Sequence, residues 1–529
     1  MNATHTGDDG FGGEAVMDAL RANKLAVVLL TPAITFWIWS IGSYLNSPLR
    51  RYPGPFLARW TNIWRLLQVI SGEYAPRMKK LHEKYGPIVR LGPNLLDLDL
   101  PELSRVIYNT DGKWMKSDFY KNNSAIVDGK ITYHLFSQVD NVEHARLKRP
   151  IVRHYSVPSV LALEKHMDKV INDLCGHLEK RFIDQNKTCD FGAWLAYYAW
   201  DFISAVTFSK RFGYMEKGCD FDGTLHIADQ AIDYLGIVGQ MPFLDFCLDK
   251  NPIVRIGPPN LDNVARIAVE ALFPRLKGED KNFDPKNPDF LQYFIDSKTS
   301  HPEVVDDGTI INYLLLNLIA GADTTAITMR ALFYYTLRNP AIWNRLVSEV
   351  RATDIVTRET PAPYQAARAI PYLEAVVRET LRMHPAVSMT MERIVPTAGL
   401  SLPDGSTVPA GTQVGMNPYI VGRNRDVFGD DAEVYRPERW LQRADEPDDV
   451  FQERMRDWNA AELTFGGGSR ICLGRNLSQM EVYKVVATVV TRYDFEMVNP
   501  ERTWKTVSRW FYRVENGNIM VNLRRRSGF

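Results

Sequence analysis

The longest hydrophobic pattern in the body of the chain covers residues 309–338, where apolar side chains occupy nearly every side of a helical projection. At 1.5 Å per residue this helix would be roughly 45 Å long. A helix that is apolar all round is expected to be buried, and Pro340 is expected to end it. Residues 320–325 (AGADTT) interrupt the pattern with a glycine, an acid and two threonines, which are poor guests in a buried helix. We therefore expect a central core helix with a functional patch in its middle.

The rest of the body is mainly helical in periodicity and contains no internal repeat. Short β-prone segments bounded by glycine and proline occur near residues 88–100 and 394–414, the second with turn signals at Asp404-Gly405 and Ala410-Gly411. The pattern of residues 475–491 predicts an amphipathic helix. The pattern predicts a mainly α fold with small β-sheets.

The N-terminal region differs from the body because residues 25–49 carry no charge. Residues 25–45 are long enough to cross a bilayer, although a buried core helix would show the same pattern. We expect a non-cytoplasmic tail at 1–24, a transmembrane anchor at 25–45, a Pro/Gly elbow linker at 46–60 and a catalytic domain at 61–529. Because Arg50, Arg51, Arg59 and Arg65 follow the anchor, the positive-inside rule predicts a cytoplasmic domain.

Composition narrows the classes of protein further. The 529 residues include 63 Lys+Arg and 63 Asp+Glu, so no overall positive field attracts nucleic acid. Hydrophobic residues make up 45%, which excludes a mostly disordered chain. The five cysteines form no CxxC pair, which argues against a disulfide framework or a structural zinc site.

The strongest chemical signal is the segment FGGGSRICLG at residues 465–474. Its glycines present Cys472 just before a predicted helix, where backbone N–H groups and the helix dipole favour a thiolate. Gly468 and Gly474 would let the backbone approach a large flat group, and Arg470 supplies a cation for an anionic substituent. No histidine or aspartate stands beside the cysteine, so metal ligation suits it better than nucleophilic catalysis.

This segment matches F-x-x-G-x-R-x-C-x-G through Phe465, Gly468, Arg470, Cys472 and Gly474. It resembles the haem-binding signature of cytochrome P-450 monooxygenases. The resemblance extends over nearly the whole chain and is closest in appearance to fungal secondary-metabolism members of the pisatin demethylase type. It implies the cytochrome P-450 fold, haem b as the cofactor and Cys472 as the axial thiolate ligand of its iron.

Further motifs fit the same family in order and spacing. Glu379 and Arg382 resemble its E-x-x-R motif, and the resemblance implies that Arg439 joins them in a buried charge network beneath the haem. Residues 320–325 resemble its oxygen-activation site, which implies that Asp323 and Thr324 relay protons. The alternative for Thr324 is a hydroxyl that bonds back to its own helix.

The family also has basic residues that bind the haem propionates. The resemblance implies this role for Arg393 and for a position after His144, where this chain has Lys148 with Arg149 as its rival. Lysine pairs with a propionate as a point charge rather than bidentately. The alternative is a solvated basic helix face, which could dock an acidic redox partner.

The implied reaction inserts one oxygen atom from O2 into a hydrophobic small molecule, by hydroxylation, O-demethylation or epoxidation, in secondary metabolism or detoxification. Only 57 residues (529 − 472) follow Cys472, so a separate membrane reductase that uses NADPH is expected. Cytochrome b5 is a further candidate partner, and no nucleic-acid partner is expected. The resemblance implies that the protein itself lies in the endoplasmic reticulum membrane, with a single span and the catalytic domain in the cytoplasm. A non-oxygenating isomerase or dehydratase, or a haem-binding sensor, remains as an alternative. The family topology implies a substrate pocket that includes Ala320, Val387, Met389 and Met391.

Overall fold

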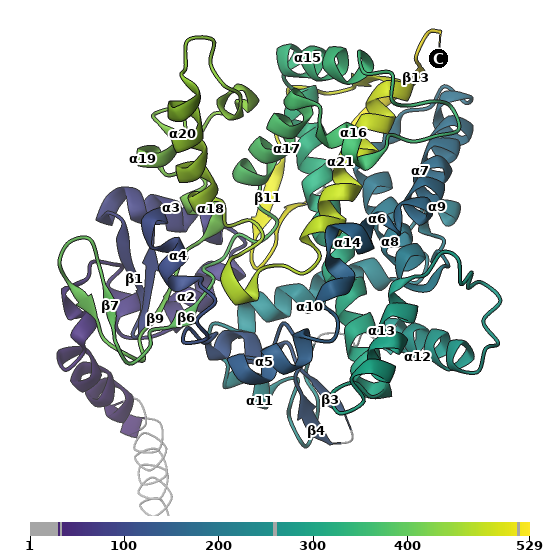
Figure 1. Cartoon of the computed structure of the whole chain (residues 1–529). Coiled ribbons are helices and arrows are strands. Elements are labelled where there is room, and N and C mark those ends of the chain that lie inside the picture. The colour runs from purple at the N-terminus through teal and green to yellow at the C-terminus, as the bar shows by residue number, and fades with distance from the viewer. Residues whose placement is uncertain (1–29, 32–33, 128, 258–261, 516–518, 529) are drawn as a thin grey trace, which may run out of the picture.

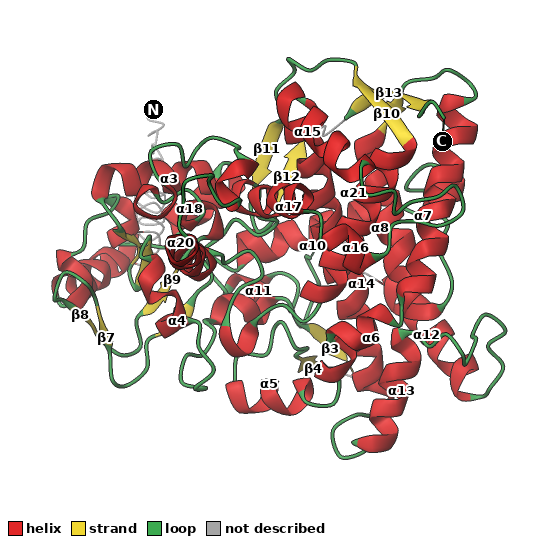
Figure 2. Cartoon of the chain, turned by 45° about the horizontal axis from the view of Figure 1, so that its top comes forward, coloured by secondary structure: helices red, strands yellow, loops and turns green. Residues whose placement is uncertain are grey.

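The computed structural model describes residues 30–31, 34–127, 129–257, 262–515 and 519–528. Helices make up most of this part of the chain and strands form small groups (Figure 2), so the predicted mainly α class is confirmed. From residue 48 onward, the helices of eight or more residues are α2 (Ile63–Ile70), α3 (Tyr74–Tyr85), α5 (Asn141–Lys148), α7 (Glu164–Leu178), α8 (Phe191–Phe208), α10 (Thr224–Val238), α12 (Asp262–Leu276), α13 (Phe290–Ser300), α14 (Asp307–Leu337), α15 (Pro340–Arg351), α17 (Pro371–Met383), α20 (Asp448–Ala461) and α21 (Arg475–Arg492).

Shorter helical pieces connect these helices. The short α-helices are α4 (Ser104–Ile107), α6 (Val157–Leu161), α9 (Tyr214–Lys217), α11 (Leu244–Cys247), α16 (Tyr364–Arg368), α18 (Pro418–Val421) and α19 (Arg425–Phe428). The 3-10 turns are η1 (Pro48–Arg51), η2 (Leu57–Arg59), η3 (Pro101–Leu103), η4 (Asp118–Asn122), η5 (Val152–Tyr155), η7 (Pro437–Trp440) and η8 (Gly468–Arg470), while η6 (Glu179–Ile183) is a π-helical turn at the end of α7.

The largest sheet has four strands in the order β1-β2-β9-β6, with β2 and β9 parallel and the other pairs antiparallel. Figure 1 shows it on the left and the helices around α14 on the right. The other sheets are β10-β13-β5, β11-β12, β3-β4 and β7-β8. The strands are β1 (Ile88–Gly92), β2 (Leu95–Leu98), β3 (Ala125–Val127), β4 (Lys130–Thr132), β5 (Cys189–Asp190), β6 (Arg393–Ile394), β7 (Leu400–Ser401), β8 (Thr407–Val408), β9 (Gln413–Gly415), β10 (Tyr493–Met497), β11 (Lys505–Ser508), β12 (Tyr512–Glu515) and β13 (Met520–Arg525).

The predicted central helix is α14, which begins where the Asp306 side chain accepts a hydrogen bond from the Thr309 N–H at 2.7 Å. We predicted that Pro340 ends this helix. Instead, α14 ends at Leu337, and Pro340 is the first residue of α15, because proline fits the first turn of a helix. Gly321 has a packing role, since a Cβ there would lie 2.7 Å from Cδ1 of Ile203 in α8. The glycine therefore lets α8 approach the middle of α14.

Helix α21 corrects the prediction of an amphipathic helix after the cysteine segment. Every residue from 480 to 492 is buried. Lys484 is ion-paired within the protein, with its Nζ 2.6 Å from Glu164 and 2.8 Å from Asp168. Glu481 is buried as well, and its Oε1 has no hydrogen-bond partner among the described residues. The polar positions that suggested a solvated face instead lie inside the core.

The described part of the predicted anchor, residues 30–31 and 34–45, is helical, and its large apolar side chains are mostly exposed. The tail at 1–24 and much of the anchor lie outside the described residues. The elbow packs onto the domain, because the Arg90 N–H donates to Pro53 O at 2.7 Å. Among the described residues, α14 alone has the length and apolarity to cross a membrane, but it lies in the hydrophobic core.

Candidate active site

Cys472 stands three residues before the first residue of α21 and is exposed. Its backbone N–H donates to Phe465 O at 2.9 Å, which closes the loop. The surrounding protein raises the pKa of the Cys472 thiol, while hydrogen bonds from the Gly474 and Arg475 N–H groups and the Arg475 charge lower it. These N–H groups at the start of the helix are the donors that were predicted to favour a thiolate.

The loop is fixed in place by a glycine that no other residue could replace without strain. Gly468 has φ +61°, and a Cβ there would lie 2.1 Å from Asn109 O. The neighbouring Ser469 N–H donates to the same oxygen at 3.0 Å. Gly474 differs, because a Cβ there would meet nothing closer than the Cys472 sulfur at 3.9 Å. Its role in admitting a flat group stays a prediction.

Four basic side chains surround the buried His144 and form what we term the cation cluster: Lys116, Lys148, Arg393 and Arg470. Burial, followed by the charges of these four residues, lowers the pKa of His144. Burial and the Arg393 charge lower the pKa of Arg470 to about 10. Because the positive charges of the cluster repel one another, a bound anionic group would stabilise the cluster. Haem b, with two propionates, fits this requirement beside an exposed cysteine.

The predicted propionate residues bind protein oxygens in this structure. Arg470 donates to Gln138 O at 2.6 Å and to Asn141 Oδ1 at 2.8 Å. Lys148 Nζ donates to Ser469 O at 2.8 Å, whereas its rival Arg149 is exposed. The structure thus brings Lys148 rather than Arg149 to the cysteine loop.

Lys116 belongs to the cation cluster but was not predicted as a site residue. Its Nζ donates to Phe136 O at 2.7 Å and lies 4.2 Å from the Tyr120 ring centroid. Burial and the charges of Arg393 and Arg470 place the pKa of Lys116 well below its usual range. A lysine within an aromatic segment was the only sequence signal, because its partners are distant along the chain.

Glu379, Arg382 and Arg439 lie together, and we term them the Glu379 network. The Glu379 carboxylate accepts from Arg382 Nη2 at 2.7 Å and from Arg439 Nε at 3.0 Å, and all three side chains are nearly inaccessible. Trp440 Nε1 and the Arg436 N–H donate to the same carboxylate at 2.9 and 2.7 Å. The resemblance had not predicted these last two donors.

Asp323 and Thr324 lie in the middle of α14. Asp323 Oδ1 accepts from Trp200 Nε1 at 2.8 Å, and Oδ2 is buried with no hydrogen-bond partner among the described residues. Burial, then the charge of Asp229, raises the pKa of Asp323 to about 7. The Thr324 hydroxyl donates to Ala320 O at 2.9 Å, which is the alternative arrangement considered for it.

The predicted pocket residues lie in different environments. Ala320 is exposed although it lies in the middle of a core helix, so α14 borders an open space here. Val387 is half-buried and forms a bridge with Phe511. Met389 is buried, and Met391 is half-buried with its sulfur 3.9 Å from a Cβ placed on Gly466. Met389 is a packing residue in this structure, and Met391 lies against the cysteine loop.

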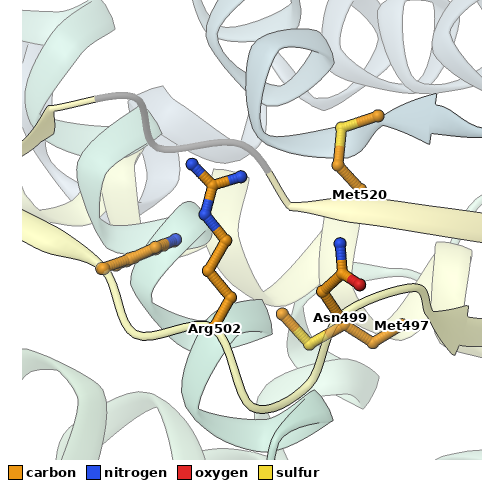
Figure 3. A pocket seen from close by; sticks show the side chains of 5 residues that line it. Met497, Asn499, Arg502 and Met520 are labelled. Carbon is orange, nitrogen blue, oxygen red and sulfur yellow. The ribbon is translucent and has the colours of Figure 1, made fainter.

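A hollow of about 620 Å³ borders residues 465–468 and 471 of the cysteine loop. Its lining includes four arginines and two glutamates, namely Arg105, Arg368, Arg378, Arg475, Glu374 and Glu462. The pocket in Figure 3, between Met497 and Met520, measures about 10 Å³, the room of about one water molecule. It shares no residue with the cysteine loop or the cation cluster.

Comparisons with known proteins agree with this geometry. The family model described as Cytochrome P450 matches residues 53–521. Cytochrome P450 monooxygenase cfoH of Aspergillus candidus is 41% identical over 96% of both chains. Cytochrome P450 monooxygenases cicH of Emericella nidulans and vrtE of Penicillium aethiopicum are 35% and 32% identical, over 91% and 92% of this chain and 94% and 92% of theirs. The chain therefore belongs to the cytochrome P450 family and is a haem-thiolate monooxygenase.

Proposed function

We propose that this monooxygenase inserts one oxygen atom from O2 into a hydrophobic small molecule, by hydroxylation, O-demethylation or epoxidation, in secondary-metabolite biosynthesis or detoxification. The proposal rests on the open Cys472 sulfur, which two backbone N–H groups hold beside the cation cluster. A haem-thiolate isomerase or dehydratase would use the same cysteine without needing an acid and a hydroxyl on α14. The presence of Asp323 and Thr324 favours the oxygenase.

In this proposal the Cys472 thiolate would bind the haem iron, and Arg393, Arg470, Lys148 and Lys116 would pair with the two propionates. Bound haem supplies the oxygen activation, to which a thiolate ligand contributes electron density. Arg470 and Lys148 would exchange the carbonyl oxygens that they now bind for propionate oxygens, which form stronger, charge-assisted hydrogen bonds. His144 is buried among these cations and stays neutral.

Asp323 is proposed to hold a proton for the reaction. Its pKa of about 7 lets it release and regain a proton near neutral pH. The Thr324 hydroxyl, now bonded to Ala320 O, would turn towards the reacting oxygen to pass the proton on. Thr324→Ala is expected to divert electrons to peroxide, measured as hydrogen peroxide formed per NADPH consumed. Unchanged coupling in this variant contradicts the relay.

We propose that electrons come from a separate NADPH-dependent reductase, with cytochrome b5 as a further donor. The hollow beside the cysteine loop offers four arginines against two glutamates, which suits an acidic partner surface. Together with the expected anchor at residues 25–45, this favours a protein of the endoplasmic reticulum membrane. The exposed apolar side chains of residues 34–45 and the arginines that follow support that location, with the domain on the cytoplasmic side.

The deciding experiment is an absorption titration of the purified ferric protein with hydrophobic aromatics, terpenoids and polyketides. A low-to-high-spin shift with one class identifies the substrate family to test for turnover. Cys472→Ser is expected to abolish the thiolate spectrum, whereas Cys219→Ser, at another exposed cysteine, should leave it unchanged. A folded, haem-supplemented protein without a haem band would contradict the proposed function.

A further inference from the structure

Arg90, in the middle of β1, is a buried cation whose hydrogen bonds go to neutral oxygens. The residue is 1% exposed. Its Nη2 donates to Pro93 O at 2.7 Å and to Ser47 Oγ at 3.1 Å, and its Nε donates to Gly92 O at 3.1 Å. Its Nη1 is buried with no hydrogen-bond partner among the described residues. Burial lowers the pKa of Arg90, as expected for a cation that no anion neutralises.

Arg90 belongs to a group of side chains that meet at Tyr44, where the expected anchor ends. We term Arg50, Arg59, Trp60 and Arg90 the anchor-base cluster. The Cζ atoms of Arg50 and Arg90 each lie 5.7 Å from the centroid of the Tyr44 ring, and the Trp60 ring centroid lies 4.4 Å from it. Arg59 Nη1 donates to the Tyr44 hydroxyl at 3.4 Å, which is longer than a usual hydrogen bond. The cluster therefore gathers three positive charges around one neutral side chain.

The anchor-base cluster has more hydrogen-bond donors than the protein satisfies. Arg59 Nε and Trp60 Nε1 are buried, and like Arg90 Nη1 they have no hydrogen-bond partner in the described part of the chain. Of the acids in that part of the chain, none forms an ion pair with the three arginines of the cluster. Buried donors without acceptors cost free energy. A phosphate group would remove this cost, because it brings negative charge and several acceptor oxygens together.

We propose that the anchor-base cluster binds the phosphate of an anionic phospholipid headgroup, an inference that rests on the proposed membrane location of the protein. The helix of residues 34–45 leaves the molecule below the four-stranded sheet (Figure 1), and its large apolar side chains are mostly exposed. Leu45, Phe56 and Leu57 are exposed apolar residues next to the cluster in sequence. Headgroup phosphates lie directly outside the hydrocarbon core of a bilayer, so they are available where this helix ends.

The exposure of the cluster sets the path by which a phosphate reaches it. Arg50 is exposed, and Tyr44, Arg59 and Trp60 are half-buried. The Tyr44 side chain, which contacts every member of the cluster, moves aside as the phosphate enters. The phosphate oxygens then accept hydrogen bonds from the three unsatisfied N–H groups, while Arg50 pairs with the phosphate from the solvent side. The net negative charge of an anionic lipid makes it a better ligand than a zwitterionic one.

The test measures the binding of short-chain phosphatidylglycerol to the full chain in a non-ionic detergent by native mass spectrometry. Short-chain phosphatidylcholine and inorganic phosphate are the other two probes. We expect one phosphatidylglycerol per chain. Phosphatidylcholine should bind roughly tenfold more weakly because its choline opposes the arginines, and inorganic phosphate should do so because it lacks acyl chains.

Two variants at partly accessible positions test the contacts. Trp60→Phe keeps an aromatic ring but removes the indole N–H, and Arg50→Gln removes the exposed cation. Each is expected to weaken phosphatidylglycerol binding by roughly tenfold, as for one charge-assisted hydrogen bond. Arg51→Gln is the matched control, because Arg51 Nη2 already donates to Thr407 O at 2.8 Å and to Tyr52 Oη at 2.9 Å. It should leave the binding unchanged.

Equal binding of phosphatidylglycerol and phosphatidylcholine overturns the proposal, and so does an Arg51→Gln variant that loses as much affinity as Arg50→Gln. Inorganic phosphate that binds as tightly as phosphatidylglycerol overturns the assignment to a lipid. A full chain that does not associate with phosphatidylcholine vesicles would contradict the proposed membrane location, whereas the measurement in detergent would still decide the role of the cluster. A protein without a thiolate haem spectrum would contradict the oxygenase function alone, since the anchor-base cluster shares no residue with the cysteine loop or the cation cluster.

Discussion

Two buried groups of charges in this molecule are built in opposite ways. In the Glu379 network each charge has an opposite partner, and the carboxylate accepts hydrogen bonds from two arginines, a tryptophan and a backbone N–H. In the cation cluster basic side chains lie beside one another, and burial together with the Arg393 charge lowers the pKa of Arg470 to about 10. The first group is complete within the protein. In the second, none of the four cations forms an ion pair with a carboxylate of the described residues, so this group is complementary to an added anion.

The difference separates a structural role from a binding role. A satisfied buried network fixes the positions of α17 and the segment around η7, and removing one member strands the others. A cluster of like charges lowers the stability of the protein until a ligand neutralises it. The cluster therefore increases cofactor affinity and decreases the stability of the haem-free protein. The two groups should therefore respond with opposite signs when a charge is removed.

The largest effect is expected at Glu379. Glu379→Gln keeps the size of the side chain but leaves Arg382 and Arg439 without their counter-charge, so we expect a loss of about 3–5 kcal/mol in the free energy of unfolding. Denaturant unfolding followed by circular dichroism measures it. Glu270→Gln is the control, because Glu270 belongs to an exposed pair with Arg266 and should cost less than about 1 kcal/mol. Equal costs in the two variants would mean that the Glu379 network does not stabilise the fold.

A smaller effect is expected at Lys116, where substitution should raise the stability of the haem-free protein and lower the haem affinity. Lys116→Met removes a buried cation that its neighbours oppose, so the haem-free protein should unfold at a higher denaturant concentration. The same variant loses a propionate partner, and its haem affinity should fall by roughly tenfold, as for one charge-assisted hydrogen bond. Haem titration and denaturant unfolding measure the two effects.

The matched control for Lys116 is Arg149→Gln, since Arg149 is exposed beside the same cluster. It should change neither quantity. If Lys116→Met destabilises the haem-free protein and leaves haem affinity intact, Lys116 is a structural residue and the cation cluster loses a member.

The sequence predicted those features that depend on local spacing. The three-residue separation places Glu379 beside Arg382 on α17, and the apolar run of residues 309–338 matches α14 within two residues at each end. The glycine loop before a helix was also readable, because positive φ at Gly468 requires glycine.

Features that depend on contacts between distant segments were not predicted from local pattern. Lys116 meets Phe136 and Arg393 only after the chain has folded. The polar residues of α21 suggested a solvated face because their partners, such as Glu164, lie some 300 residues away. Arg439 was placed beside Glu379 only by the family resemblance, since no periodicity relates two residues so far apart.

The smallest effect is expected at His144 and appears in the pH dependence of stability. Burial and the cation cluster lower the pKa of His144 in the folded protein, so below its unfolded value of about 6.5 the unfolded chain binds a proton that the folded protein does not. The free energy of unfolding must then fall as the pH drops below about 6.5, by up to about 1.4 kcal/mol per pH unit. His144→Gln should remove this part of the slope, measured by unfolding of the haem-free protein between about pH 6.5 and 4.

The control for His144 is His226→Gln, at an exposed position on α10, which should leave the slope unchanged. Haem sharpens the test, because its propionates would neutralise the four cations that oppose a charge on His144. The His144 contribution to the slope should therefore be smaller in the haem-loaded protein than in the haem-free protein. An equal contribution in both forms would mean that burial alone suppresses the charge of His144, and that the cation cluster is not where the propionates bind.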